Sequence, residues 1–144
     1  WGGAIDFANS RKADQVRLGA GINFHVARGF EGDGDYTYQK LTVAGGRLFT
    51  AQLFQFRGLY HLNLRTFFRA IVQYTDVDRD PQQYFALVVP RSRRVFTQLL
   101  FNYKLNPQTV LLLGYSDNAN GTTYYDVTRS DRTVFVKLGY AFVF

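Results

Sequence analysis

The feature that most constrains this chain is a strict two-residue alternation of apolar and polar side chains. It is clearest in QVRLGAGINFHV, residues 15–26, where every second residue is apolar and the intervening ones are polar or glycine. Successive side chains of a β-strand point to opposite faces, so the pattern predicts a strand with one apolar and one polar face. Similar alternation recurs in three further segments, residues 67–75, 94–104 and 134–144.

Weaker alternation predicts additional strands at about residues 1–8, 35–43, 47–61 and 108–116, which gives about eight in all. In the third of these the pattern slips at Leu53 and Phe54. We expect a β-bulge there, which would return Phe54, Phe56 and Tyr60 to the apolar face. Most of these strands are long enough to cross a bilayer, since a tilted transmembrane strand needs ~9–11 residues.

The expected connections differ in length. Residues 61–65 and 104–108 are tight, whereas residues 76–94 and 116–132 are long and polar at both ends. Residues 27–35 form a connection of intermediate length. Short turns on one side and long loops on the other are typical of outer-membrane barrels, whose short turns are periplasmic. An even number of strands would place both termini on the periplasmic side.

A soluble sandwich or lipocalin-like barrel would show the same alternation, so composition has to separate the two classes. Aromatic residues make up 17% of the chain, yet the mean hydropathy is slightly negative. A membrane barrel combines these properties because only every second residue faces lipid. The polar face is rich in small residues, which suits a lumen. We therefore predict an all-β fold, a transmembrane antiparallel up-and-down β-barrel in one domain spanning residues 1–144.

The acidic residues are expected in the loops, and the basic residues of the strands are expected in the lumen. The formal charge is +6, and the cations of the strands fall on the polar face. A narrow interior with unpaired cations is costly unless it is wet or loop carboxylates fold in to pair. A hydrated, non-conducting interior is favoured over an anion-preferring pore. The expected lumen cations are Arg17, Arg57, Arg69, Lys104 and Lys137, with His25, and the acids expected in connections are Asp14, Glu31, Asp33, Asp35, Asp76, Asp78, Asp80, Asp117, Asp126 and Asp131.

A second group of cations falls at the predicted outer rim. Guanidinium groups bind phosphate bidentately, so this group is either a solvated loop or a contact with lipopolysaccharide. The residues concerned are Arg79, Arg91, Arg93, Arg94, Arg129 and Arg132.

We expect no catalytic residue, metal or cofactor. The acidic stretches 31–35 and 76–80 offer alternating oxygen ligands, but solvated turns explain them better, and the chain has no cysteine. His25 and His61 fall near the predicted periplasmic turns. The serines, Ser10, Ser92, Ser116 and Ser130, fall in the predicted outer connections. A strand of ~10 residues rises by more than ~25 Å, so a Ser–His hydrolase is excluded if this topology is right.

The segment KLGYAFVF, residues 137–144, resembles the C-terminal assembly signal of outer-membrane barrels. That signal has a polar residue, a glycine and two spaced hydrophobic residues, the last of them aromatic. The resemblance implies that the barrel-assembly machinery reads this strand, which would close the barrel by pairing with residues 1–8. The matching residues are Lys137, Gly139, Tyr140, Phe142 and Phe144.

Residues 67–81, 91–118 and 131–144 resemble the closing strands of a bacterial family. Its members join a family-9-type carbohydrate-binding-like domain to a C-terminal outer-membrane barrel of unassigned function. No such binding domain is present here, so the resemblance implies a barrel, either closed on itself or the terminal arc of a larger one.

The expected function is a structural or membrane-anchoring role in the bacterial outer membrane, without catalysis. The expected partners are the lipid bilayer, lipopolysaccharide and the barrel-assembly machinery, with no nucleic acid, and the chain is expected to be a monomer. The first alternative is a small pore with a basic, anion-preferring lumen. The second is a soluble β-barrel that binds an anionic ligand.

Overall fold

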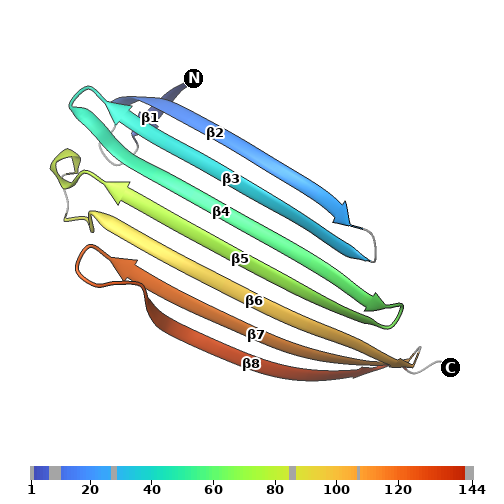
Figure 1. Cartoon of the computed structure of the whole chain (residues 1–144). Coiled ribbons are helices and arrows are strands. Elements are labelled where there is room, and N and C mark those ends of the chain that lie inside the picture. The colour runs from blue at the N-terminus through green and yellow to red at the C-terminus, as the bar shows by residue number, and fades with distance from the viewer. Residues whose placement is uncertain (1, 7–10, 27–28, 85–86, 107, 142–144) are drawn as a thin grey trace.

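The chain forms one antiparallel sheet in which each strand is hydrogen-bonded to its sequence neighbours (Figure 1). The structure is a computed structural model that describes residues 2–6, 11–26, 29–84, 87–106 and 108–141. The predicted all-β, up-and-down fold of eight strands is confirmed. The strands are β1 (Gly2–Asp6), β2 (Arg11–Val26), β3 (Phe30–Val43), β4 (Gly46–Asn63), β5 (Thr66–Arg79), β6 (Arg91–Asn106), β7 (Thr109–Thr122) and β8 (Thr128–Tyr140), with one 3-10 turn, η1 (Pro81–Gln83).

From β2 to β8 the strands are longer than the sequence predicts, and the connections between them are correspondingly shorter, whereas β1 is shorter than the strand predicted at residues 1–8. The segments joining β5 to β6 and β7 to β8 shrink to residues 80–90 and 123–127. We call the end of the sheet where β2, β4 and β6 finish the tight-turn end. The end where β3, β5 and β7 finish is the loop end. At the tight-turn end, β4 and β5 are joined by Leu64 and Arg65 alone.

The prediction that the carboxylates lie in connections is wrong for most of them. Only Asp80 and Asp126 fall between strands. The polar segment that looks like a loop in the sequence is instead the first half of β3, because its residues continue the two-residue alternation. The acids that lie within strands are Asp14, Glu31, Asp33, Asp35, Asp76, Asp78, Asp117 and Asp131.

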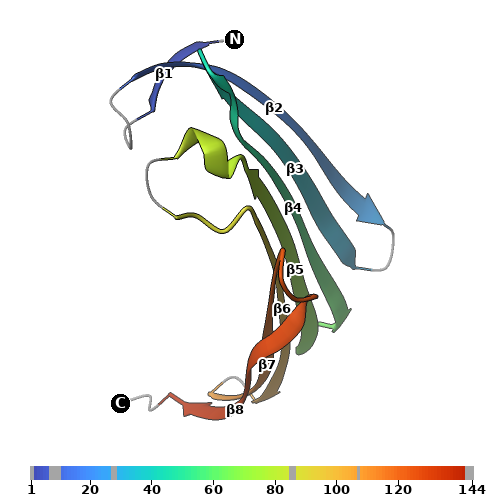
Figure 2. The ribbon, with the colours of Figure 1, turned by 90° about the vertical axis from the view of Figure 1, so that its left-hand side faces the viewer.

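The predicted closed barrel is not formed. Figure 2 shows the sheet curving into an arc, with β1 and β8 at its two edges. In the described part of the chain, β1 pairs only with β2, and β8 pairs only with β7. The expected seam between the last strand and residues 1–8 is therefore absent, and residues 142–144 lie outside the described part. The curvature is too gentle for eight strands to complete a circle.

The ladders assign the side chains to two faces, since residues directly opposite each other in neighbouring strands share a face. Leu18 lies opposite Tyr38 on one face, and Arg17 lies opposite Gln39 on the other. The bulge predicted at Leu53 is wrong, because the ladder between β3 and β4 passes through that position without a shift. Leu53 instead lies on the polar face. The shift in this ladder falls between Leu41 and Thr42.

The connection between β5 and β6 identifies which face is concave. Figure 2 shows this connection inside the arc. Its Gln83 side chain donates a hydrogen bond of 2.8 Å to the backbone oxygen of Gly45, and Tyr84 packs against a small apolar cluster on the polar face. The polar face is therefore the concave face, and the apolar face is the convex face. The cluster, Ala13, Leu41, Val43 and Leu48, contains every buried hydrophobic residue among the described ones.

Glycines on the convex face make room for aromatic rings. Gly32 lies directly opposite Phe24, and a Cβ atom at Gly32 would overlap the Phe24 ring. That ring also contacts Phe30 and Phe56, at centroid distances of 5.7 Å and 6.4 Å. An aromatic ring that covers a glycine across a ladder shields the exposed backbone and pins the register.

We predict that Gly32→Ala destabilises the sheet while Gly34→Ala does not. At Gly32 the added methyl group would displace the Phe24 ring from its neighbours, at a cost of about 1–3 kcal/mol for overpacking. At Gly34 the nearest side-chain atom, of Ile22, is at an ordinary 3.5 Å, so alanine should be neutral or stabilise by about 0.5 kcal/mol. Urea unfolding of both variants measures the difference, and equal stabilities would contradict the packing role of Gly32.

Candidate membrane-facing surface

The convex face is an exposed apolar surface that extends over β2 to β8. Leu18, Ile22 and Val136 are 61%, 65% and 68% exposed. Monomeric soluble proteins rarely expose a continuous apolar patch of more than a few hundred Å², and larger patches mark contact with a protein or a membrane. Other exposed hydrophobic residues on this face are Val26, Tyr36, Phe54, Tyr60, Phe68, Tyr103, Leu113, Val134, Leu138 and Tyr140.

Aromatic rings gather on this face toward the tight-turn end. Phe24 contacts Phe30 and Phe56, and Phe30 lies 6.3 Å from Tyr60 between ring centroids. Further along the face, β6 and β8 contribute Tyr103 and Tyr140. We call this group the lower aromatic belt.

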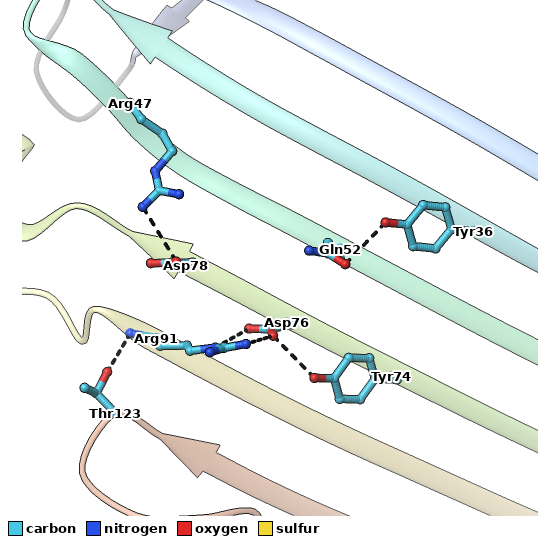
Figure 3. Close-up of polar contacts among 8 residues, drawn as sticks. All are labelled: Tyr36, Arg47, Gln52, Tyr74, Asp76, Asp78, Arg91 and Thr123. Atoms are coloured by element: carbon cyan, nitrogen blue, oxygen red, sulfur yellow. Dashed lines mark hydrogen bonds and ion pairs between the residues drawn. The ribbon is translucent and has the colours of Figure 1, made fainter.

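A second group of aromatic residues lies nearer the middle of the strands, and its hydroxyl groups are hydrogen-bonded (Figure 3). Tyr74 donates to the Asp76 carboxylate at 3.3 Å, and Tyr115 donates to the Asp117 carboxylate at 2.6 Å. Each pair is a Tyr-x-Asp sequence on a single strand, so both side chains point to the same face. These tyrosines, with Tyr36, form the upper aromatic belt.

Ion pairs lie just beyond the upper aromatic belt. Arg91 donates two hydrogen bonds to Asp76, with Nε at 3.1 Å and Nη2 at 2.6 Å (Figure 3). The backbone nitrogen of Arg91 also donates to Oγ1 of Thr123, at 3.0 Å. On the neighbouring pair of strands, Arg129 lies 2.7 Å from Asp117. These pairs were not predicted from the sequence, because both carboxylates fall in segments that resemble loops.

The structure divides the arginines expected at the outer rim between the two faces. Arg94 lies on the concave face, where its Nε donates to Asn120 at 3.2 Å. Arg79 is also on that face, since it lies opposite Phe49. The remaining four are on the convex face, namely Arg91, Arg93, Arg129 and Arg132.

The cations expected in the lumen all lie on the concave face, but one is paired. Nε of Arg57 lies 2.8 Å from Asp33, and His25 lies 4.0 Å from Glu31. These pairs line a hollow of about 430 Å³ that also contacts Arg69. The carboxylates of β3 therefore supply part of the countercharge that was expected from loop carboxylates. The expected cations are Arg17, Arg57, Arg69, Lys104 and Lys137.

The expectation of a small and polar inner face holds for β2 but not for the whole sheet. Glycines, glutamine and asparagine occupy the concave face of β2. From β4 onward, apolar side chains alternate with polar ones on this face. Examples are Leu53, Ile71, Phe96, Leu100 and Phe135.

The expected assembly-signal residues are only partly described. Lys137 and Gly139 lie on the concave face and Tyr140 on the convex face. Phe142 and Phe144 lie outside the described residues. The strand that carries the signal is an edge of the sheet.

The histidines and serines, which a hydrolase site would need, are spread along the sheet. His25 and His61 lie near the tight-turn end of β2 and β4. The serines expected in connections lie in strands instead, Ser92 in β6, Ser116 in β7 and Ser130 in β8, and Ser10 lies outside the described residues. The described residues contain no group of three or more His, Cys, Asp or Glu that could hold a metal ion. They also contain no helix long and apolar enough to cross a membrane.

Comparisons with known protein families, with curated proteins and with solved structures found no match.

We predict that the Asp76–Arg91 pair contributes more to stability than the Asp78–Arg47 pair. The Asp76 side chain is only 10% exposed and is bound at two atoms, whereas Arg47 and Asp78 are 3.6 Å apart and both 46% exposed. Double-mutant cycles with alanine should give a coupling free energy of about 1–2 kcal/mol for the first pair. The second should give about 0.5 kcal/mol or less. Equal couplings in urea unfolding would contradict this ranking.

Proposed function

We propose that the chain is an arc of a transmembrane β-barrel in a bacterial outer membrane, with a structural or membrane-anchoring role and no catalysis. The convex face contacts lipid and the concave face lines the interior. The tight-turn end, where β8 finishes, lies on the periplasmic side. The short β1, whose Gly2 lies opposite Gln15 of β2, lies at the loop end and runs toward it.

One observation carries this proposal, the exposed apolar convex face that extends over β2 to β8. Removing apolar surface from water lowers the free energy by about 25 cal/mol per Å². Leaving this face exposed to water is therefore strongly unfavourable. A bilayer covers it without a protein partner. Amphipathic aromatic rings are enriched at the borders of the apolar band in membrane barrels, and Tyr60, Tyr103 and Tyr140 lie at the tight-turn border of this face.

The strand lengths agree with a bilayer. From β2 to β8 the strands have 13 to 18 residues, which at ~3.3 Å per residue extend roughly 43–59 Å. Tilted by about 45°, they rise roughly 30–42 Å, against a hydrocarbon thickness of about 30 Å. The residues beyond the hydrocarbon are then the charged ones at the loop end.

The open edges favour a barrel of more than eight strands. Unpaired backbone groups of an edge strand cannot face hydrocarbon, because each unsatisfied group costs several kcal/mol. Additional strands must therefore lie between β8 and β1. Since these two edges run in opposite directions, an even number of added strands closes an antiparallel barrel.

The proposal is tested by the lipid exposure of alternate residues along β6. The chain has no cysteine, so single cysteines at positions 96–101 can carry an environment-sensitive fluorophore in phosphatidylcholine vesicles. Nitroxide groups on the acyl chains should quench the labels at Thr97, Leu99 and Phe101. The labels at Phe96, Gln98 and Leu100 should respond instead to a water-soluble quencher.

Quenching without a two-residue period would contradict the proposal. A chain that stays folded and monomeric without detergent would contradict it as well. Heat-modifiable migration on a gel, which reports a barrel that resists unfolding in detergent, is the quickest preliminary measurement.

A pore with a basic lumen is the second candidate, supported by one observation. Arg17, Arg69, Lys104 and Lys137 are exposed on the concave face, and none of them forms an ion pair with a residue that the structure describes. A wide, wet interior lined with such cations would favour anions. Planar bilayers containing the chain should then conduct ions, with chloride preferred over potassium. A conductance no higher than that of a bilayer without protein would exclude the pore.

We predict that Leu99→Arg destabilises the membrane-inserted chain far more than Gln98→Arg. Leu99 is central among the convex residues of β6, so an arginine there would lie at the bilayer midplane, at a cost of about 2–4 kcal/mol. Gln98 is adjacent in sequence but lies on the concave face, where water solvates a new cation, and the cost should be below about 1 kcal/mol. Urea unfolding from vesicles measures both, and equal costs would argue against lipid on the convex face.

A further inference from the structure

The charges that line the hollow of about 430 Å³ on the concave face are ordered by sign across the strands. Two rows of directly opposed residues cross it from β3 to β5. One row is Glu31, Leu59 and Arg69, and the other is Asp33, Arg57 and Ile71. The carboxylates therefore lie on β3 and the guanidinium groups on β4 and β5.

Only one carboxylate and one guanidinium group in the hollow neutralise each other. Nε of Arg57 lies 2.8 Å from the Asp33 carboxylate. The group nearest in charge to Glu31 is the His25 imidazole, which at 4.0 Å is beyond hydrogen-bond distance. Arg69 forms no ion pair or hydrogen bond with any residue that the structure describes. The Glu31 side chain is 50% exposed and Arg69 is exposed, so a ligand can reach both.

The two charges without a close partner are held apart by apolar side chains. Leu59 lies between Glu31 and Arg69 in the same row, and Ile71 lies beside Arg57 in the next row. Leu59 and Ile71 are both partly exposed to the hollow. Strands two places apart in a sheet are about 10 Å apart. The hollow therefore has a negative side, an apolar middle and a positive side.

We propose that this hollow binds a zwitterionic dipeptide, with its ammonium group at Glu31 and its carboxylate at Arg69. The inference goes beyond the proposed function and rests on it only for a concave face that water reaches. A guanidinium group binds a carboxylate through two parallel hydrogen bonds. Leu59 and Ile71 then contact the apolar side chains of the ligand as it lies across β4.

The distribution of charge favours a ligand that carries both signs. A simple anion bound at Arg69 would be repelled by Glu31, and a simple cation bound at Glu31 would be repelled by Arg69. A free amino acid has both charges on one carbon atom, whereas a dipeptide separates them by a further residue, as the two sides of the hollow require. The volume lies within the range of about 300–1,000 Å³ that is usual for small-molecule sites.

The test compares leucyl-leucine with two analogues that each lack one charge. The chain is placed in phosphatidylcholine nanodiscs, which leave both ends of it open to solvent, and binding is measured by calorimetry. N-acetyl-leucyl-leucine has no ammonium group, and leucyl-leucinamide has no carboxylate. Each analogue should bind about tenfold more weakly than leucyl-leucine, because each loses a charge-assisted hydrogen bond.

Substitutions in the hollow should remove these preferences one at a time. In E31Q, leucyl-leucine should lose its advantage over the N-acetylated form, and in R69Q it should lose its advantage over the amide. The matched variants D35N and R17Q should keep both preferences, because Asp35 and Arg17 lie on the concave face of β3 and β2 but do not line the hollow.

The outcomes separate this proposal from the proposed function. The quenching pattern along β6 is measured in the same nanodiscs, and its absence would contradict the membrane arc. If the pattern is present but leucyl-leucine does not bind, the dipeptide site is wrong and the membrane arc stands. If N-acetyl-leucyl-leucine binds as tightly as leucyl-leucine, the hollow binds simple anions and the zwitterion is wrong. Equal weakening by R69Q and R17Q would also contradict the site, because it would indicate a general effect of charge.

Discussion

Backbone hydrogen bonding between sequence neighbours is the interaction on which this structure depends. Every strand from β2 to β7 is paired on both sides, and the ladders keep the side-chain alternation of neighbouring strands in phase. A slip of one residue in any ladder would move a whole strand's apolar set to the other face. The shifts that do occur lie toward the ends of the ladders, as at Leu41/Thr42 and His61/Asn63, so the middle of the sheet keeps its two faces intact.

The sheet has almost no interior of its own. Ala13, Leu41, Val43 and Leu48 are the buried hydrophobic residues in the described part of the chain, and they lie beneath the connection that carries Tyr84. A core of this size cannot offset the conformational entropy lost by ordering so long a chain. The apolar residues that would ordinarily make a core lie on the convex face, so the surroundings of that face must supply the missing stabilisation.

The two-residue period made much of this fold predictable from the sequence. It assigned Leu18 and Ile22 to one face and Arg17 and Asn23 to the other, as the ladders do. It also located the arginines expected at the outer rim, but it assigned no face to those that it placed in connections. Arg93 and Arg94 are neighbours in sequence, and only the register of β6 separates them.

The failures have physical causes. Asp33 and Asp35 lie beside glycines in a polar stretch typical of a loop, yet an inner face that carries Arg57 accepts such carboxylates within a strand. Leu53 was interpreted as a slip in the pattern because it adjoins another apolar residue, Phe54, yet the inner face of β4 accepts an apolar side chain within the regular ladder. Closure could not be predicted, because the number of strands in a circle depends on curvature and stagger, which local alternation does not encode.

The pairing of sequence neighbours alone has a consequence for how such proteins change over evolutionary time. A hairpin such as β4–β5, joined by two residues, pairs with the rest of the sheet along its two outer ladders. Duplicating or deleting one hairpin would leave the partners of all the other strands, and the direction of each, unaltered. The circumference could therefore grow or shrink by two strands at a time, and the same arc could be reused in assemblies of different diameter.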